Sequence, residues 1–487
     1  MFRELNQHLR LNPKVLELVG ISLIVGLAFW LRLYRLTTPL ADWHSWRQAD
    51  TASVTREYVK NGVDLLMPQY HDLSNIPSGL DNPNGYRMVE FPIINGLTAR
   101  LYQFFPRFDL HVFSRLISIF FSLGTLIFLY LLVLEFSGKK EALLTALVFV
   151  VLPYSVYYSR TILPEVAMVF FSLVSIYFLV RWLALSQHSI RSFHYWLSAM
   201  AAALALLLKP YAIFLALPMA YLAWKRCGGR VFKSLTTYLY PVLALTPLLL
   251  WRIWISQFPE GIPAFGWLFN GDGIRFKGAF FRWIFAERIG KLILGYWGLI
   301  FLGLGLIKPI MKKEGWFFIW WMVAVLVYVT VFATGNVRHD YYQIPLIPII
   351  SIFVAKGIFY LIERKNVISY SLLITSLLFM LAFSWFEVRG YYNINNWAIV
   401  EAGKAIDRLT PADALVIAPY NGDAAFLYQT NRRGWPMGGE IEDKISKGAD
   451  YYVSVSFDEE ARKLMSIYER ADESEDFVLI KLTKVLQ

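Results

Sequence analysis

The sequence predicts a polytopic α-helical membrane protein with an external helical loop beside the membrane and a small C-terminal α/β domain. Composition is the first observation behind this prediction. Hydrophobic residues make up 57% of the 487 residues, only 17% are charged, and the mean hydropathy is +0.46. The second is a series of apolar runs of about 20 residues, the length that a helix needs to cross a bilayer. The third is a change to soluble composition after residue 386.

The apolar runs predict about eleven spans in a membrane domain at 1–386. The first run, 15–34, is long and lacks a following small-residue cleavage site, so we interpret it as a retained anchor rather than a signal peptide. The short pair 194–208 and 210–224 is also compatible with one helix kinked at Pro210. The other expected spans are 113–136, 142–158, 163–184, 235–255, 289–307, 315–334, 342–362 and 367–386.

Basic residues indicate the orientation of these spans. The N-terminal segment and every even-numbered connection carry Lys or Arg, as at Lys139 and Lys140. Such residues mark cytoplasmic loops, so we expect a cytoplasmic N-terminus and, with an odd span count, an external 387–487 domain at the plasma membrane. That domain holds 12 Lys/Arg and 17 Asp/Glu, so the net charge of +11 arises in the membrane region. This distribution argues against nucleic-acid binding.

The C-terminal residues predict a small α/β domain, because strands alternate with helices. The segment Arg432-Arg433-Gly434-Trp435 is interpreted as a surface turn, with an acceptor contact as the alternative. One cysteine, Cys227, excludes an intrachain disulfide. The expected helices are 396–408, 423–429 and 458–470, and the expected strands are 413–420, 451–457 and 477–482.

The first external loop, 35–112, contains the stretch DWHSWRQADTASVTREY at 42–58. Its Ser45-Trp46-Arg47-Gln48 fits a capping box and predicts a surface helix that ends near Gly62. The helix N-terminus suits a phosphate group. Arg47 and Asp50 share one face, where the alternative is a simple local ion pair. A second amphipathic segment, 93–105, leads back to the membrane.

Unusual polar residues gather on the same side of the predicted membrane. Glu165 follows Pro164 at the start of a span, where a carboxylate costs up to about 2.5–3.5 kcal/mol on insertion scales. Such a group usually faces a cavity, and the alternative is an N-terminal glutamate stabilised by the helix dipole. Arg160, Lys209 and the segment Arg338–Tyr342 lie in other connections on this side.

These segments together resemble the GT-C superfamily of membrane glycosyltransferases, and in pattern they are most similar to protein O-mannosyltransferases and the aminoarabinose transferase of lipid A. The resemblance extends over most of residues 1–365. One family pattern, an acid followed by an arginine in the first loop, is reversed here, with Arg47 and Asp50 exchanged. The segments that carry the resemblance are Trp46–Tyr58, Val89-Glu90-Phe91-Pro92, Leu163-Pro164-Glu165, Lys209-Pro210 and Arg338–Pro345.

The resemblance implies transfer of a sugar from a polyprenyl-phosphate donor to a lipid, glycan or protein acceptor, with inversion. The general base would be Asp50 or Asp42, with Glu165 as a supporting carboxylate. A divalent metal ion is the one cofactor considered, held by Glu90 with His44 or His339. The donor phosphate would be bound by Arg47, Arg160, Lys209, Arg338 and Tyr341.

Two other functions stay open at this point. A transporter or flippase of a lipid-linked substrate would show broken or charged helices at mid-membrane and pseudo-repeats, whereas the polar residues here lie at the outer ends of the spans. A non-catalytic scaffold would leave Glu165 unexplained. The aromatic and basic segment 274–292 predicts an interfacial helix that either gates the donor or anchors passively.

Overall fold

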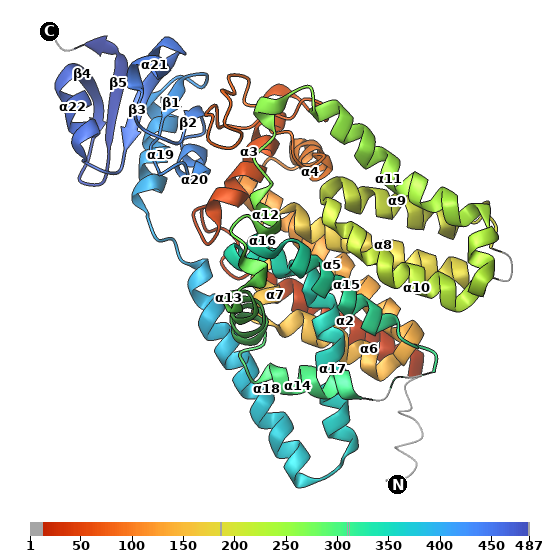
Figure 1. Ribbon diagram of the computed structural model, residues 1–487. Coiled ribbons are helices and arrows are strands. Elements are labelled where there is room, and N and C mark those ends of the chain that lie inside the picture. Colours follow the sequence, from red (N-terminus) through yellow and green to blue (C-terminus); the bar gives the residue numbers. More distant parts are fainter. Residues whose placement is uncertain (1–12, 186–187, 309, 311, 486–487) are drawn as a thin grey trace.

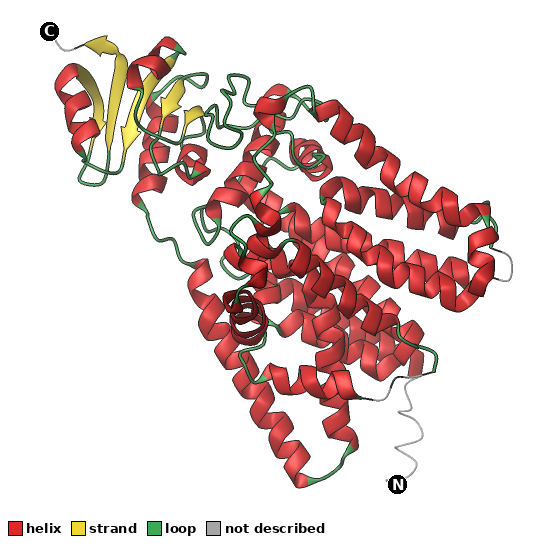
Figure 2. Ribbon diagram, viewed as in Figure 1, coloured by secondary structure: helices red, strands yellow, loops and turns green. Residues whose placement is uncertain are grey.

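A computed structural model describes residues 13–185, 188–308, 310 and 312–485 of the chain. Most of the chain forms a body of helices (Figure 1). The long strands gather in a small separate domain next to the C-terminus (Figure 2). A connection after the last long helix of the body leads into this domain, which lies beside the loop 35–112.

The helical body buries one large apolar core, to which most of its long helices contribute. Helix α6 ends at Val151, and Pro153 starts the short helix α7, so the expected span 142–158 is broken by proline. The helices of the body are α2 (Pro13–Arg32), α5 (Leu110–Ser137), α6 (Lys139–Val151), α7 (Pro153–Tyr158), α8 (Pro164–Leu183), α9 (Phe193–Leu208), η1 (Pro210–Leu215), α10 (Ala216–Cys227), η2 (Gly228–Lys233), α11 (Leu235–Ile255), α14 (Gly298–Ile307), α15 (Phe317–Val331), α16 (Ala333–Arg338), η6 (Asp340–Leu346), α17 (Ile347–Glu363), α18 (Val367–Val388) and η7 (Arg389–Tyr392).

The structure shows a membrane-type helical fold without establishing eleven spans. Among the residues it describes, six helices are long and apolar enough to cross a membrane. A seventh is added if Gly278–Ile293 and Gly298–Ile307, which meet at 113°, form one broken span. The expected interfacial helix at 274–292 is divided into short pieces. These are η4 (Ile274–Phe276), α13 (Gly278–Phe281) and η5 (Arg282–Ile293), and they follow η3 (Pro259–Gly261) and α12 (Trp267–Asn270).

Helices α3 (Ser45–Asn61) and α4 (Ile93–Phe104) cover one end of the body and match the two expected surface helices. The expected capping box is wrong. His44 precedes α3 in the left-handed conformation, with φ of 54°, and no side chain caps the helix. Gln48 instead donates its amide to Asp42 Oδ1 at 3.1 Å. Gly62 ends α3 with φ of 93°, as expected.

Helices α14 and α17 cross at two glycines. A Cβ atom on Gly305 would lie 1.9 Å from the carbonyl oxygen of Phe353, and one on Gly357 would lie 1.9 Å from that of Phe301. Only hydrogen fits between these backbones. The close crossing holds the core helix α17 against α14.

The C-terminal domain has a five-stranded sheet in the order β2-β1-β3-β5-β4. Strand β1 pairs in parallel with β2 and β3, whereas β5 is antiparallel to β3 and β4. All six expected elements are present, and α21, β2 and β4 were not expected. The elements are α19 (Ala398–Leu409), β1 (Leu415–Ile417), α20 (Ala424–Gln429), β2 (Arg433–Trp435), α21 (Ile441–Ser446), β3 (Ala449–Ser454), α22 (Glu459–Ile467), β4 (Tyr468–Glu473) and β5 (Val478–Val485).

The loop 35–112 pairs with the edge of this sheet. Gly434 donates its N–H to the His71 carbonyl at 2.9 Å, and its own carbonyl accepts from the Leu73 N–H at 2.8 Å. The interpretation of 432–435 as a surface turn is therefore wrong, because this segment contains an edge strand. Arg432 is buried and donates to Asp407 at 2.7 Å. These backbone hydrogen bonds fix the domain on the loop that carries α3.

Candidate active site

A cavity of about 430 Å³ lies at the end of the body that α3 and α4 cover. One wall is apolar and aromatic and comes from the segment 262–269, together with Phe332. The opposite wall is polar and comes from α3, the segment 87–90 and the start of η1. The lining residues used below are Trp46, Arg47, Arg87, Glu90, Lys209, Tyr211, Arg252, Phe265, Trp267, Phe332, Tyr341 and Tyr342.

The polar wall carries four cationic side chains and one carboxylate, Glu90. Glu90 Oε1 contacts the Arg47 guanidinium and lies 2.6 Å from Lys209 Nζ. Arg47 also donates from Nη1 to Thr51 one turn along α3, at 3.1 Å. Asp50 and Glu165 pair with Arg87 and Lys209 from outside this cavity, so four cations face three carboxylates and one net positive charge remains. The cavity is therefore suited to an anion with an apolar part.

Lys209 joins this wall to the buried carboxylate of Glu165. Its Nζ lies 3.0 Å from Glu165 Oε1, which also accepts a hydrogen bond from the Tyr211 hydroxyl at 3.0 Å. Glu165 has no exposed surface, and its other oxygen has no hydrogen-bond partner among the described residues. Pro164 and Glu165 open α8, so the backbone places this carboxylate at the mouth of the bundle.

Glu90 and Lys209 stabilise each other's charged form. Burial alone would raise the pKa of Glu90, but Arg47 and Lys209 outweigh burial and hold it well below its usual range. Burial would lower the pKa of Lys209, but Glu165 and Glu90 raise it above its ordinary value. Both groups are therefore charged at neutral pH.

A second, smaller cavity of about 40 Å³ lies on the other side of Arg47, Arg87 and Glu90, which line both cavities. Asp50 lines only the smaller one, beside hydroxyl groups of α3, α4 and α5. Asp50 Oδ2 accepts a hydrogen bond from Arg87 Nη2 at 2.8 Å. These three shared residues form a charged partition with a carboxylate behind it.

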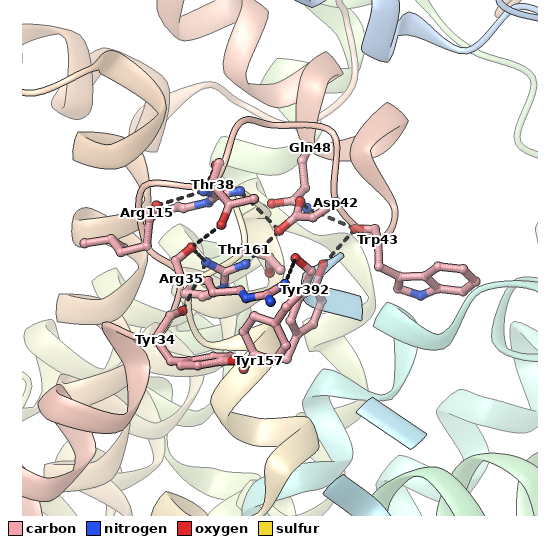
Figure 3. Close-up of polar contacts among 12 residues, drawn as sticks. Tyr34, Arg35, Thr38, Asp42, Trp43, Gln48, Arg115, Tyr157, Thr161 and Tyr392 are labelled. Atoms are coloured by element: carbon pink, nitrogen blue, oxygen red, sulfur yellow. Dashed lines mark hydrogen bonds and ion pairs between the residues drawn. The ribbon is translucent and has the colours of Figure 1, made fainter. Parts of the chain in front are cut away.

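Asp42, the alternative base, lies in a separate buried network (Figure 3). Its Oδ2 accepts from Arg160 at 2.7 Å and from Arg115 at 3.2 Å. Its Oδ1 accepts from Gln48. Asp42 lines neither cavity, and both of its oxygens are occupied, Oδ2 by the two arginines and Oδ1 by Gln48. We therefore place Asp42 among the residues that anchor the segment before α3.

The expected convergence of four cations on one phosphate is not what the structure shows. Arg47 and Lys209 meet at Glu90, and Tyr341 lines the same cavity. Arg160 is held by Asp42 and by backbone carbonyls outside it. Arg338 is 56% exposed and lies 3.7 Å from Asp272. Its guanidinium stacks on Trp267 at 5.7 Å, which places it at the rim.

The expected metal ligands are not assembled. Glu90 is held by two cations, whereas His44 Nε2 lies 2.5 Å from Asp340 Oδ1. The rings of His44 and His339 are 5.8 Å apart. Over the described residues, no three His, Cys, Asp or Glu side chains are grouped as a metal site would need. These three residues do not fit a shared metal ion, so we derive no step from one.

Three residues of the site were not predicted from the sequence. Arg87 holds Asp50, and Arg252 adds a fourth cation to the cavity wall. Arg252 sits at the end of an apolar run, on the side opposite the basic connections. Lys and Arg are usually rare on that side, so this position could have been singled out from the sequence. Asp340 is fully buried and accepts from His44, Trp43, Tyr158 and Tyr391. It thereby fixes the start of α3 on the bundle.

Comparison with known proteins places part of the chain in the range of one family model. Residues 108–254 match the family described as dolichyl-phosphate-mannose-protein mannosyltransferase. No curated protein sequence matches the chain at a significant level.

Solved structures match over nearly the whole chain. ArnT from Cupriavidus metallidurans, bound to undecaprenyl phosphate, is 14% identical and has a TM-score of 0.66, with 94% of this chain and 97% of that chain covered. An oligosaccharyltransferase from Archaeoglobus fulgidus, tethered to an acceptor peptide, is 10% identical and has a TM-score of 0.61, with 91% of this chain and 69% of that chain covered. At these identities the matches show the fold, which is that of ArnT.

Proposed function

We propose that the chain transfers a sugar from a polyprenyl-phosphate donor to an acceptor hydroxyl at the outer face of the plasma membrane. The observation that carries this proposal is the pair of cavities that share Arg47, Arg87 and Glu90. The larger cavity combines a cationic wall with an aromatic one, as an amphipathic phosphate requires. The smaller one presents a carboxylate, Asp50, to a hydroxyl.

The donor occupies the larger cavity in this proposal. Its phosphate binds to Arg47, Lys209 and Arg252, and the first isoprenoid units pack on the aromatic segment 262–269. Such charge-assisted bonds suit a phosphate that must leave as an anion. The ArnT structure with undecaprenyl phosphate supports a ligand of this class, because the two chains share their fold. Glu165 holds Lys209 in place from behind, at 3.0 Å.

The acceptor hydroxyl approaches from the side of Asp50. Asp50 takes the proton of the hydroxyl as general base, and the oxygen attacks the anomeric carbon of the sugar. The bond from that carbon to the phosphate oxygen breaks, and its electron pair stays on the phosphate. Attack from one side of the partition and departure on the other makes this a single displacement. The product therefore has inverted anomeric configuration.

The first experiment is a transfer assay with the purified protein in lipid bilayers. Several radiolabelled polyprenyl-phosphate sugars are offered together with membrane extract as the acceptor source. We expect label to move from one donor, and we expect Asp50→Asn to lower turnover by roughly 10²-fold or more. The donor KM should change little, since Asp50 lies behind the partition.

Asp109→Asn is the matched control, because this carboxylate lies in the same loop, is exposed, and caps no helix through its side chain. It should transfer at the rate of the unaltered protein. Failure to transfer label from any donor would contradict the proposed function. Full turnover by Asp50→Asn would contradict the assignment of the base.

A further inference from the structure

Arg32 is a buried charge without a counter-charge. It ends α2 and has no exposed surface. Its guanidinium donates to Ser122 Oγ at 3.2 Å, to the Ala28 carbonyl at 3.1 Å and to Ser155 Oγ at 3.4 Å. Across the described part of the chain, no carboxylate pairs with it. The equally buried Arg160, by contrast, has Asp42 at 2.7 Å.

A lone cation inside a helical bundle is unfavourable. Serine hydroxyls and one carbonyl offer only dipoles, and an arginine cannot lose its proton to escape the cost. A buried charge is ordinarily paired or neutralised by a bound ion. Arg32 therefore requires an anion that the chain itself does not provide among the residues described.

A small cavity lies beyond the serine partners of this guanidinium, and Arg32 itself does not line it. Its volume is about 30 Å³, and its walls include Ser122, Ser155 and Phe149, all of which Arg32 contacts. Ser159 also lines it, and accepts from the Ser122 hydroxyl at 2.8 Å. A water needs roughly 10–15 Å³ of such space. The cavity thus admits a single small ion and excludes a phosphate with any substituent.

We propose that Arg32, together with the hydroxyl groups of Ser122, Ser155 and Ser159, binds a small monovalent anion of the halide class. The anion neutralises Arg32 and joins α2 to α5 and α7. The site lies inside the bundle, and none of its four residues lines either cavity of the active site. It therefore stands independently of the proposed sugar transfer.

Thermal unfolding of the purified protein tests the proposal at constant ionic strength, with chloride replaced stepwise by gluconate. We expect chloride and bromide to raise the Tm by about 2–4 °C with saturation, as a ligand of the folded state does. Arg32→Met should remove this dependence. Ser155→Ala should weaken it, so that several-fold more chloride is needed for half the shift. Crystals grown in bromide should show an anomalous peak between Arg32 and Ser155.

Ser376→Ala is the matched control, since this serine is equally buried in a span and its hydroxyl has no partner among the described residues. It should keep the full chloride response. If Arg32→Met does not fold, Ser155→Ala and the bromide peak decide the question. A Tm that is insensitive to chloride, an unchanged response in Ser155→Ala, or a cavity that holds only water would overturn the proposal.

Discussion

Lys209 Nζ, on the cationic wall of the larger cavity, lies 3.0 Å from Glu165 Oε1, and both side chains are buried. The charge of each residue is therefore stabilised by the other. Without Lys209, the carboxylate of Glu165 would be a buried charge with only Tyr211 as a donor. Without Glu165, the ammonium would be drawn wholly toward Glu90, 2.6 Å away.

This pairing predicts non-additive effects in a double-mutant cycle. Glu165→Gln and Lys209→Met should each lower transfer by roughly 10²-fold, as loss of groups that position charge commonly does. The double variant should lose much less than the product of the two, because the second change finds the pair already broken. Transfer rates of the four proteins measure this coupling. Strictly multiplicative losses would show that the two residues act separately.

Substitution of Arg47 should affect the donor KM more than substitution of Arg338. Arg47 is buried and contacts Glu90, whereas Arg338 lies at the rim with 56% of its side chain exposed. Arg47→Lys keeps the charge but loses the forked donor geometry, so we expect the donor KM to rise at least about tenfold. Arg338→Lys should change it less than about threefold. Equal effects of the two substitutions on donor KM would contradict this ranking.

The sidedness of the polar residues could be predicted from sequence, whereas their pairing could not. The order of the apolar runs and the basic connections between them placed α3, α4 and the start of α8 at one end of the bundle. The contact between Glu165 and Lys209, in contrast, depends on how α8 and the end of α9 pack, which no local pattern encodes. Arg160 looked like a phosphate ligand for the same reason, because its partner Asp42 is 118 residues away in sequence.

The C-terminal domain also contains an element, strand β2, that the local sequence does not predict. Strands β1, β3 and β5 carry the apolar runs that predicted them. The short strand β2 is defined by long-range pairing, with β1 on one side and the segment after His71 on the other. A three-residue strand that contains Arg433 and Gly434 has no periodicity from which it could be read.

The crossing of α14 and α17 predicts that a glycine-to-alanine substitution lowers stability at Gly305 but not at Gly303. Gly305→Ala would place a Cβ 1.9 Å from the Phe353 carbonyl oxygen, so the helices must separate. We expect a loss of roughly 1–3 kcal/mol in the free energy of unfolding, as for overpacked cores. Gly303→Ala, on the same helix with nothing within 4 Å of the new atom, is the control and should be neutral. Thermal unfolding in detergent measures both, and a stable Gly305→Ala would contradict the close crossing.

The orientation can be tested with an impermeant thiol reagent on intact cells, in a background where Cys227 is replaced by Ala. Cysteines introduced at Ser78 in the first loop and at Lys484 in the C-terminal domain should react, because both positions are proposed to be external. A cysteine at Lys312 should react only after the membrane is opened, since basic connections face the cytoplasm. Labelling of position 312 in sealed cells would reverse the proposed topology.

Asp72 predicts a pH-dependent stability at the seam between the first loop and the C-terminal domain. Its neighbours His71 and Leu73 hydrogen-bond to Gly434, and its own Oδ1 accepts from the Ser74 N–H at 2.8 Å. Burial raises the pKa of Asp72 from 3.8 to about 7, with the Asp50 carboxylate adding to the rise. Between these two values the folded protein holds a proton that the unfolded chain releases.

The free energy of unfolding should therefore fall as pH rises through this window, by at most ~4 kcal/mol for this group. Asp72→Asn resembles the protonated carboxyl and can still accept from Ser74. We expect its Tm to decline less than that of the unaltered protein as pH rises from 5 to 8, so that the gap between them widens with pH. Asp81→Asn, at an exposed carboxylate of the same loop, should follow the unaltered curve. If the Tm of Asp72→Asn runs parallel to that of the unaltered protein, Asp72 is not protonated in the folded state.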